Sequence, residues 1–197
     1  MTKLAVAISL VVLLANSASS TARSNRDAVL DREEYAVYSA LISQRFIKNE
    51  TRLIVITDPT CCDISEVTKE NLNLSMNQLL PFSQDTLESL RQRNKETKHL
   101  QGAFKLAVPY QIVDYNKIKK LFEPGMFEDE WKTFYRWYPR SNGYITLSRV
   151  GFNRDGDEAL VNTGWMSGAL SGEGHYFLLS KKAGKWQVQR SAATWMV

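Results

Sequence analysis

The sequence has few cysteines, histidines and prolines, and each shortage argues against a class of function. Its 197 residues include two cysteines, two histidines and five prolines. With only two histidines, few imidazole side chains are available for acid–base catalysis or for binding a metal ion. The sequence also lacks a P-loop, a dinucleotide-binding glycine fingerprint and a His-Glu-x-x-His zinc motif. We therefore expect no cofactor and no metal site.

The sequence has no apolar run long enough to cross a bilayer. The longest run, Leu4 to Ala15, follows Lys3 and covers about a dozen residues, whereas a transmembrane helix needs about 20. This run precedes Ser20-Thr-Ala22, the small-residue pattern of a signal-peptide cleavage site, with cleavage after Ser20 as an alternative. No cysteine adjoins the cleavage site, so we expect no lipid anchor. Residues 1–22 are predicted to be a secretory signal peptide, and residues 23–197 a single soluble domain, secreted or periplasmic.

The charge is small and spread along the chain. The formal net charge is +4 at pH 7, with 25 basic and 21 acidic residues. Nucleic-acid binding calls for a clustered basic patch on a matching fold motif, and the sequence shows neither. A nucleic-acid partner is therefore not expected, which leaves a small molecule or another envelope protein.

The two cysteines, Cys61 and Cys62, are adjacent. Exported proteins usually use cysteines as disulfides, but neighbouring Cα atoms lie about 3.8 Å apart, below the usual disulfide range. Three interpretations stay open: a vicinal disulfide that acts as a redox-sensitive turn, a bridge between chains, or two thiols. We favour a loop with incidental thiols, because no Cys-x-x-Cys spacing supports redox work.

The C-terminal third predicts a run of short strands joined by tight turns. Asp155-Gly156 is a strong hairpin signature, and the glycine-rich segment Ser167–Gly174 is expected to be a flexible connection. Alternation of apolar and polar residues in the last strand is typical of an antiparallel sheet with one wet face. The expected strands cover residues 144–150, 158–165, 175–180 and 186–190.

The rest of the chain predicts helices and one central strand. Tyr38, Ile42 and Phe46 recur at helical spacing, and residues 52–57 form an apolar, β-branched strand. The fold class is therefore α+β: an antiparallel sheet with a four-strand C-terminal meander and helices packed on one face. The order of elements also resembles the nuclear-transport-factor-2-like and cystatin-like arrangements.

An aromatic stripe marks the helix of residues 127–138. Phe127, Trp131, Phe134 and Tyr138 lie on one helical face. A ligand-stacking wall is one interpretation, but we favour a helix packed on the sheet, because such stripes mostly build cores.

A pattern in the C-terminal third resembles a group of small secreted bacterial proteins. The matching runs are Ser148–Asn153, Ala159–Val161, Gly172–Lys181 and Gly184–Trp186, with a weaker extension to Tyr135-x-x-Tyr-Pro139. The resemblance implies export and no particular activity. Many of those proteins carry cysteines where this chain has Ser167 and Ser171, so a disulfide across the glycine-rich segment is not expected here.

Two hypotheses for function follow. The first is a non-enzymatic binding or interaction domain, with Arg149, Trp165, His175, Tyr176 and Trp131 as binding candidates. The second is a hydrolase-like enzyme in which Ser171 is the nucleophile and Glu173 and His175 transfer protons. The surrounding Gly168-Ala-Leu-Ser-Gly172 is not a Gly-x-Ser-x-Gly elbow, so the binding hypothesis is favoured.

Overall fold

The computed structural model describes residues 32–61, 64, 82–123, 125 and 127–197. The chain divides into two compact units, Met1–Tyr35 and Ala36–Val197. Only residues 32–35 of the first unit are described, and they open a helix of residues 32–45. The predicted signal peptide and Cys62 lie outside the described residues, and the start of the domain at residue 23 stays a prediction.

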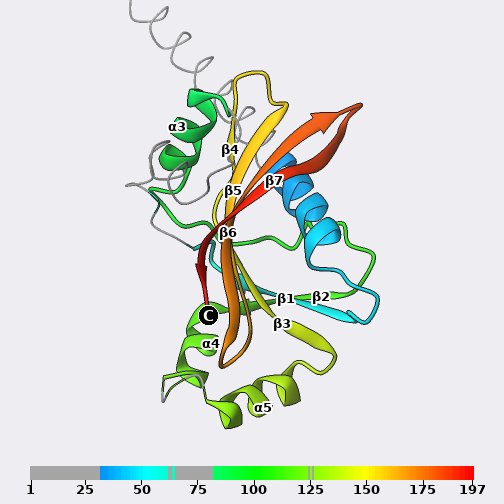
Figure 1. Ribbon diagram of the computed structural model, residues 1–197, viewed down its shortest axis with the longest axis vertical. Helices are drawn as coiled ribbons and strands as arrows, with labels where there is room; N and C mark the ends of the chain where they lie inside the picture. Colours follow the sequence, from blue (N-terminus) through cyan, green and yellow to red (C-terminus); the bar gives the residue numbers. More distant parts are fainter. Residues whose placement is uncertain (1–31, 62–63, 65–81, 124, 126) are drawn as a thin grey trace, which may run out of the picture. The chain divides into compact units, whose positions relative to one another are not determined.

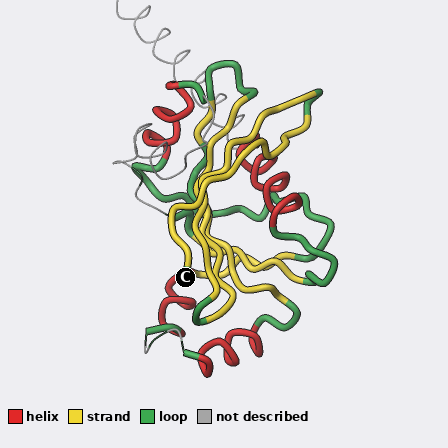
Figure 2. Tube along the Cα trace, in the orientation of Figure 1, coloured by secondary structure: helices red, strands yellow, loops and turns green. Residues whose placement is uncertain are grey.

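The second unit is built on one mixed sheet of seven strands (Figures 1 and 2). The strand order is β2-β1-β3-β5-β6-β7, and the short β4 pairs with β5. β1 pairs in parallel with β2 and β3, whereas the remaining pairs are antiparallel. The strands are β1 (Leu53–Asp58), β2 (Tyr110–Asp114), β3 (Ser141–Leu147), β4 (Gly151–Phe152), β5 (Glu158–Gly168), β6 (Ser171–Lys182) and β7 (Lys185–Met196).

The α+β class and the mostly antiparallel sheet are confirmed, but the prediction that the glycine-rich segment is a flexible connection is wrong. β5 runs to Gly168 and β6 starts at Ser171, so most of the Ser167–Gly174 segment is strand. Gly164 pairs with Gly174 in the ladder, and residues 172–174 continue the pairing to β7. Cross-strand hydrogen bonds therefore order a segment whose local composition is typical of a loop.

Three helices share one face of the sheet: α3 (Gln84–Arg93), α4 (Tyr115–Leu121) and α5 (Glu128–Trp137). α3 packs over Leu160 and Tyr176, whereas α4 and α5 pack over Tyr144 and Met166. Alternation along β5 puts Leu160 and Met166 on the same side of the sheet.

Residues 36–45, the part of the first helix that belongs to the second unit, pack against the opposite face. The last of these residues, Arg45, lies over the ring of Phe177, and Phe46 meets the same ring edge-on at 6.3 Å. Phe177 is an odd-numbered residue of β6, so its side chain leaves the sheet on the side away from Tyr176. The prediction that all helices pack on one face is therefore wrong, because both faces of this sheet carry apolar side chains that need cover.

The aromatic stripe of α5 builds a core, as favoured from its sequence. Trp131, Phe134 and Tyr138 are buried in one cluster with Tyr144 of β3, and the ring of Trp131 stacks on that of Tyr144 at 6.1 Å. Phe127 departs from the stripe, because it is the N-cap residue of α5 and is 64% exposed.

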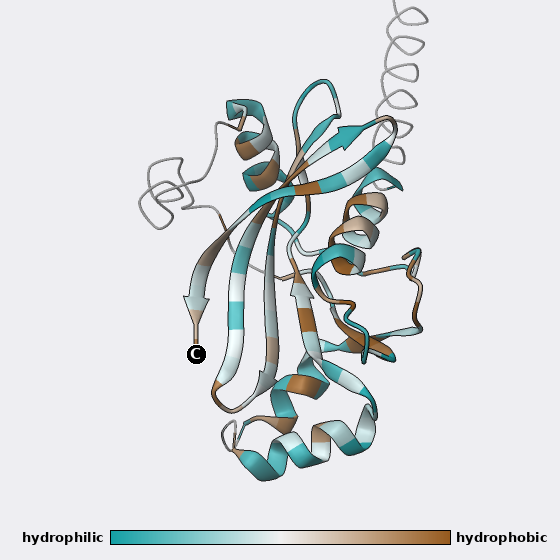
Figure 3. Ribbon diagram, turned by 45° about the vertical axis from the view of Figure 1, so that its right-hand side comes forward, coloured by the Kyte–Doolittle hydropathy of each residue, from teal (hydrophilic) through white to brown (hydrophobic). Residues whose placement is uncertain are grey.

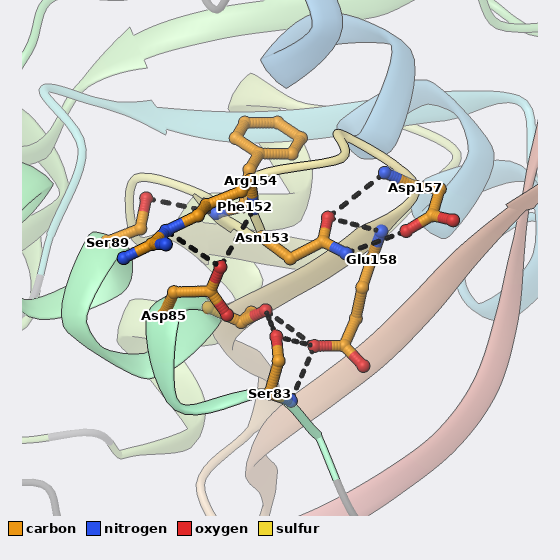
Figure 4. Close-up of polar contacts among 9 residues, drawn as sticks. Ser83, Asp85, Ser89, Phe152, Asn153, Arg154, Asp157 and Glu158 are labelled. Atoms are coloured by element: carbon orange, nitrogen blue, oxygen red, sulfur yellow. Dashed lines mark hydrogen bonds and ion pairs between the residues drawn. The ribbon is translucent and has the colours of Figure 1, made fainter.

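A carboxylate from β5 anchors the N-terminus of α3 (Figure 4). Oε1 of Glu158 accepts hydrogen bonds from Ser83 N at 2.8 Å, Ser83 Oγ at 2.7 Å and Thr86 Oγ1 at 2.5 Å. The contact satisfies donors at the helix start and places a negative charge at the positive end of the helix dipole. One strand residue therefore replaces the side-chain cap that Ser83 does not supply to its own helix.

Replacing Glu158 with alanine is expected to lower the free energy of unfolding by about 2–3 kcal/mol, because three donors lose one charged acceptor. The measurement is urea unfolding followed by circular dichroism. Glu88→Ala is the matched control: its side chain is 66% exposed and pairs only within α3, so the loss should stay below about 0.5 kcal/mol. Equal losses in the two variants would contradict the anchoring role of Glu158.

None of the helices in the described ranges is both long enough and apolar enough to cross a membrane. Figure 3 shows hydrophilic and hydrophobic residues side by side on these helices, as expected where one helix face meets the sheet and the other meets water.

Candidate functional site

Three adjoining hollows form one groove on the face of the sheet that carries the helix of residues 32–45. They share lining residues: Lys48 and Asn142 line the first and second, whereas Arg45, Phe46 and Glu173 line the second and third. Their volumes are about 500, 30 and 190 Å³. We refer to these as the outer, central and inner hollows, and together as the groove.

The sheet side of the groove is formed by neighbouring positions of β5 and β6. Trp165 pairs with Glu173 and Thr163 pairs with His175, so these four residues point to the same face. The indole nitrogen of Trp165 donates to the backbone oxygen of Asn142 at 2.7 Å. This bond ties the end of β5 to the first residues of β3, where the outer hollow begins.

His175 lies at the inner end of the groove with its side chain 16% exposed. Its ring stacks on Phe177 with centroids 5.5 Å apart, and Nε2 lies 3.1 Å from Glu173 Oε2. That distance is an ion-pair distance, but the angles are not those of a hydrogen bond, and both ring nitrogens are buried without a hydrogen-bond partner. Buried polar atoms in this state gain free energy when a ligand supplies a partner.

The structure does not bring Ser171 to His175. The two residues are four apart on the extended strand β6, so their Cα atoms are about 13 Å apart. The Ser171 hydroxyl instead lies 2.9 Å from the Ser167 hydroxyl. The hydrolase hypothesis needs a nucleophile within hydrogen-bond reach of its base, and the proximity of Glu173 and His175 does not supply one.

The groove also carries positively charged side chains, which the sequence did not indicate as site residues. Arg45, Lys48 and Arg140 line the hollows, and within the described ranges none of them has a carboxylate within 4.0 Å. Arg45 donates to Ser191 Oγ at 3.4 Å, and Lys48 Nζ lies 6.0 Å from the ring centre of Trp165. Neither Arg45 nor Lys48 stands in a recognisable motif: Arg45 ends the helix of residues 32–45 and Lys48 follows it, and helical spacing predicts only the buried face.

Two of the predicted binding residues are core residues instead. Trp131 belongs to α5, is 4% exposed and packs against α4 and the sheet, and Tyr176 is 4% exposed under α3. Burial raises the pKa of the Tyr176 hydroxyl to about 12. Neither side chain lines the groove, because Trp131 and Tyr176 both point to the opposite face of the sheet.

Arg149 also lies away from the groove, and its predicted place in mid-strand is wrong. β3 ends at Leu147, and Arg149 lies in the connection to β4. Its backbone nitrogen and oxygen both bond the side chain of Asn94, at 2.8 and 3.0 Å. Asn94 follows α3, so these bonds hold the end of that helix against the sheet.

The remaining sulfur and imidazole groups are remote from the groove's lining. Cys61 is disulfide-bonded, so the favoured thiol interpretation is wrong for this residue. His99 is 84% exposed, and its Nδ1 lies 2.8 Å from Asp58 Oδ2. The hydrogen bond and the charge of Asp58 raise the pKa of His99 above its usual value. Among the described residues, no group of three or more His, Cys, Asp and Glu side chains could hold a metal ion.

No protein-family model, curated protein or solved structure matches this chain, so the groove itself carries the functional argument.

Proposed function

We propose that this chain is an exported, non-enzymatic small-molecule-binding domain of the bacterial cell envelope, and that the groove is its binding site. The observation that carries the proposal is the groove's composition. Trp165 and His175, both binding candidates from the sequence, line a concave surface together with cationic side chains. Ligand sites in proteins are typically such concave surfaces, with aromatic side chains and a few polar groups that converge.

The proposal includes two further points, that the protein is exported and that its sheet is of a known ligand-binding type. Lys3, the apolar run Leu4–Ala15 and Ser20-Thr-Ala22 support a signal peptide and hence a secreted or periplasmic domain. The neighbouring order β3-β5-β6-β7 supports a C-terminal meander of the kind found in nuclear-transport-factor-2-like or cystatin-like domains. In such a meander one face of the sheet can serve as the wall of a ligand site.

A thermal-shift screen against metals, metabolites, lipids and cell-wall fragments tests the proposal. A ligand at a hundredfold excess over its dissociation constant should raise the melting temperature of the protein by about 5–10 °C. Trp165→Ala and His175→Ala should abolish that shift, because both side chains line the groove.

Trp137→Ala is the matched control, because Trp137 is a 44% exposed tryptophan that lines a different hollow beside α4. Its ligand-induced shift should equal that of the wild type. A shift lost in Trp137→Ala but kept in Trp165→Ala would place the ligand outside the groove. The absence of any stabilising compound would contradict small-molecule binding and favour a protein partner.

A further inference from the structure

The charges of the groove and the volumes of its hollows select one class of ligand. Resting on the proposed binding function, we infer that the groove binds a small organic acid with a single ring. Its oxyanion lies in the central hollow, between Arg45 and Lys48, and its ring lies in the inner hollow, against Phe46 and His175.

The central hollow is suited to one oxyanion group. Its volume of about 30 Å³ is the smallest of the three and exceeds the roughly 10–15 Å³ that one water molecule needs, so it suits a small group such as a carboxylate. Arg45 and Lys48 line it, together with Asn142. Arginine and lysine donate charge-assisted hydrogen bonds to carboxylates and phosphates, and the arginine fork can do so through two parallel bonds.

Both cations are available to a ligand. Arg45 makes one long side-chain hydrogen bond, to Ser191 Oγ at 3.4 Å, and a contact of its guanidinium with the Phe177 ring at 5.4 Å. Lys48 Nζ contacts only the face of Trp165 among the described side chains. Their positive charges are therefore not neutralised by a neighbouring carboxylate within ion-pair distance.

The inner hollow is suited to a ring. Its volume of about 190 Å³ gives enough room for a benzene-sized ring, which an enclosed apolar cavity of roughly 150 Å³ holds, although this hollow is open to solvent and has polar residues in its lining. Phe46, Phe177 and His175 line it, with Phe46 edge-on to Phe177 and His175 stacked on Phe177. Phe177 is only 3% exposed, so the rings of Phe46 and His175 are the ones that a further ring can contact edge-to-face or offset. Arg45 lines both hollows, so an acid group and its ring can occupy adjacent spaces.

Glu173 is the one carboxylate among the residues that line the central and inner hollows, whereas Glu50 lines the outer hollow. The Glu173 side chain is 38% exposed, but its Oε2 lies 3.1 Å from His175 Nε2. One of the two carboxylate oxygens of Glu173 therefore lies against the imidazole of His175, and the other does not. The remaining charge of this carboxylate disfavours ligands of high negative charge, which favours a monovalent acid over a polyanion.

Phenylacetate, benzyl phosphate and benzylamine share a benzyl ring and differ in their charged group. Comparing their binding therefore shows the effect of ligand charge at a constant ring. Titration of the ¹⁵N-labelled protein, followed through the indole N–H of Trp165, gives a dissociation constant for each. Phenylacetate should bind about tenfold or more tightly than benzylamine, because the groove presents more cations than carboxylates. Added salt should weaken phenylacetate binding and leave benzylamine binding unchanged or stronger.

Variants then locate the oxyanion. Arg45→Gln and Lys48→Gln should each weaken phenylacetate binding by about tenfold, whereas Glu173→Gln should strengthen it. Lys185→Ala is the control: it removes one positive charge at the β6–β7 turn, from a residue that lines none of the three hollows, and should change nothing. Comparison of benzyl phosphate with phenylacetate tells whether the central hollow prefers a phosphate or a carboxylate.

The two proposals can fail separately. Benzylamine binding as tightly as phenylacetate would overturn the inference about charge and leave groove binding standing. Equal losses in Lys185→Ala and Arg45→Gln would also overturn it, because only overall charge would then matter. If neither anion moves the Trp165 resonance while a compound from the thermal-shift screen does, the inference fails and the proposed function survives.

Discussion

Replacing Gly143 with alanine is expected to lower the free energy of unfolding by about 2–5 kcal/mol. Gly143 has φ of 77°, a region that costs an ordinary residue about 1–2 kcal/mol. A Cβ at this position would lie 1.8 Å from the backbone oxygen of Met166 and 2.8 Å from the Cα of Ser167. Backbone atoms cannot move aside by changing rotamer, so overpacking adds about 1–3 kcal/mol.

Gly184→Ala separates the two contributions. Gly184 has φ of 75°, and a Cβ there meets nothing within 4 Å. In this variant only the unfavourable backbone conformation should lower the free energy of unfolding, by about 1–2 kcal/mol. Chemical denaturation of both variants measures the difference. If Gly184→Ala proved as destabilising as Gly143→Ala, the close approach of β3 to β5 would not be the cause.

The Gly143 variant should also disturb the groove. Asn142 precedes Gly143, lines the outer and central hollows, and accepts the indole hydrogen bond of Trp165. A displacement of β3 from β5 therefore separates two residues of the proposed site. We expect weaker binding of phenylacetate in whatever fraction of Gly143→Ala stays folded, and normal binding in Gly184→Ala.

Replacing Phe134 with alanine is expected to cost about 3–5 kcal/mol, the usual range for a buried aromatic side chain. Phe134 is fully buried, with ring centroids 5.0 Å from Tyr138, 5.3 Å from Trp131 and 5.8 Å from Tyr144. Aromatic rings are rigid and cannot collapse fully into the space left behind, so a cavity stays. Since native proteins are stable by only about 5–15 kcal/mol, this loss is a large fraction of the total free energy of unfolding.

Phe127→Ala is the matched control for Phe134→Ala. Both residues belong to the stripe read from the sequence, but Phe127 is 64% exposed. Its replacement should change the free energy of unfolding by no more than about 0.5 kcal/mol. Urea unfolding of the two variants under the same conditions gives both values. Similar losses would mean that α5 does not pack on the sheet through Phe134.

Local patterns in the sequence predicted the elements well. The apolar run before Asp58 became the strand β1 inside the sheet, and the stripe of Trp131, Phe134 and Tyr138 became a buried helix face. The Asp155-Gly156 signature lies in the turn before β5, where Gly156 has φ of 69°. These features depend on residues near each other in the chain, so backbone preference and side-chain period suffice to predict them.

Local patterns failed where distant segments pair. The glycine-rich segment looked like a loop, but β5 and β7 supply the hydrogen bonds that make it strand. Tyr176 was a binding candidate, but α3 covers it; Trp131 was a candidate too, but it packs from α5 onto the sheet, as the core interpretation of its stripe expected. Composition could not tell a buried aromatic side chain from one at a binding surface, because an aromatic residue on a strand or helix is compatible with both.

The sequence by itself determined the α+β class, the strand β1, the buried face of α5, and two of the groove's side chains, Trp165 and His175. Only the tertiary structure decided that Arg45 and Lys48 meet them, since these cations come from a segment more than a hundred residues earlier in the chain. It also decided that Ser171 points to Ser167 rather than to His175. A binding site is set by which faces of which elements meet, and that follows from strand register and from the burial of both sheet faces rather than from local sequence.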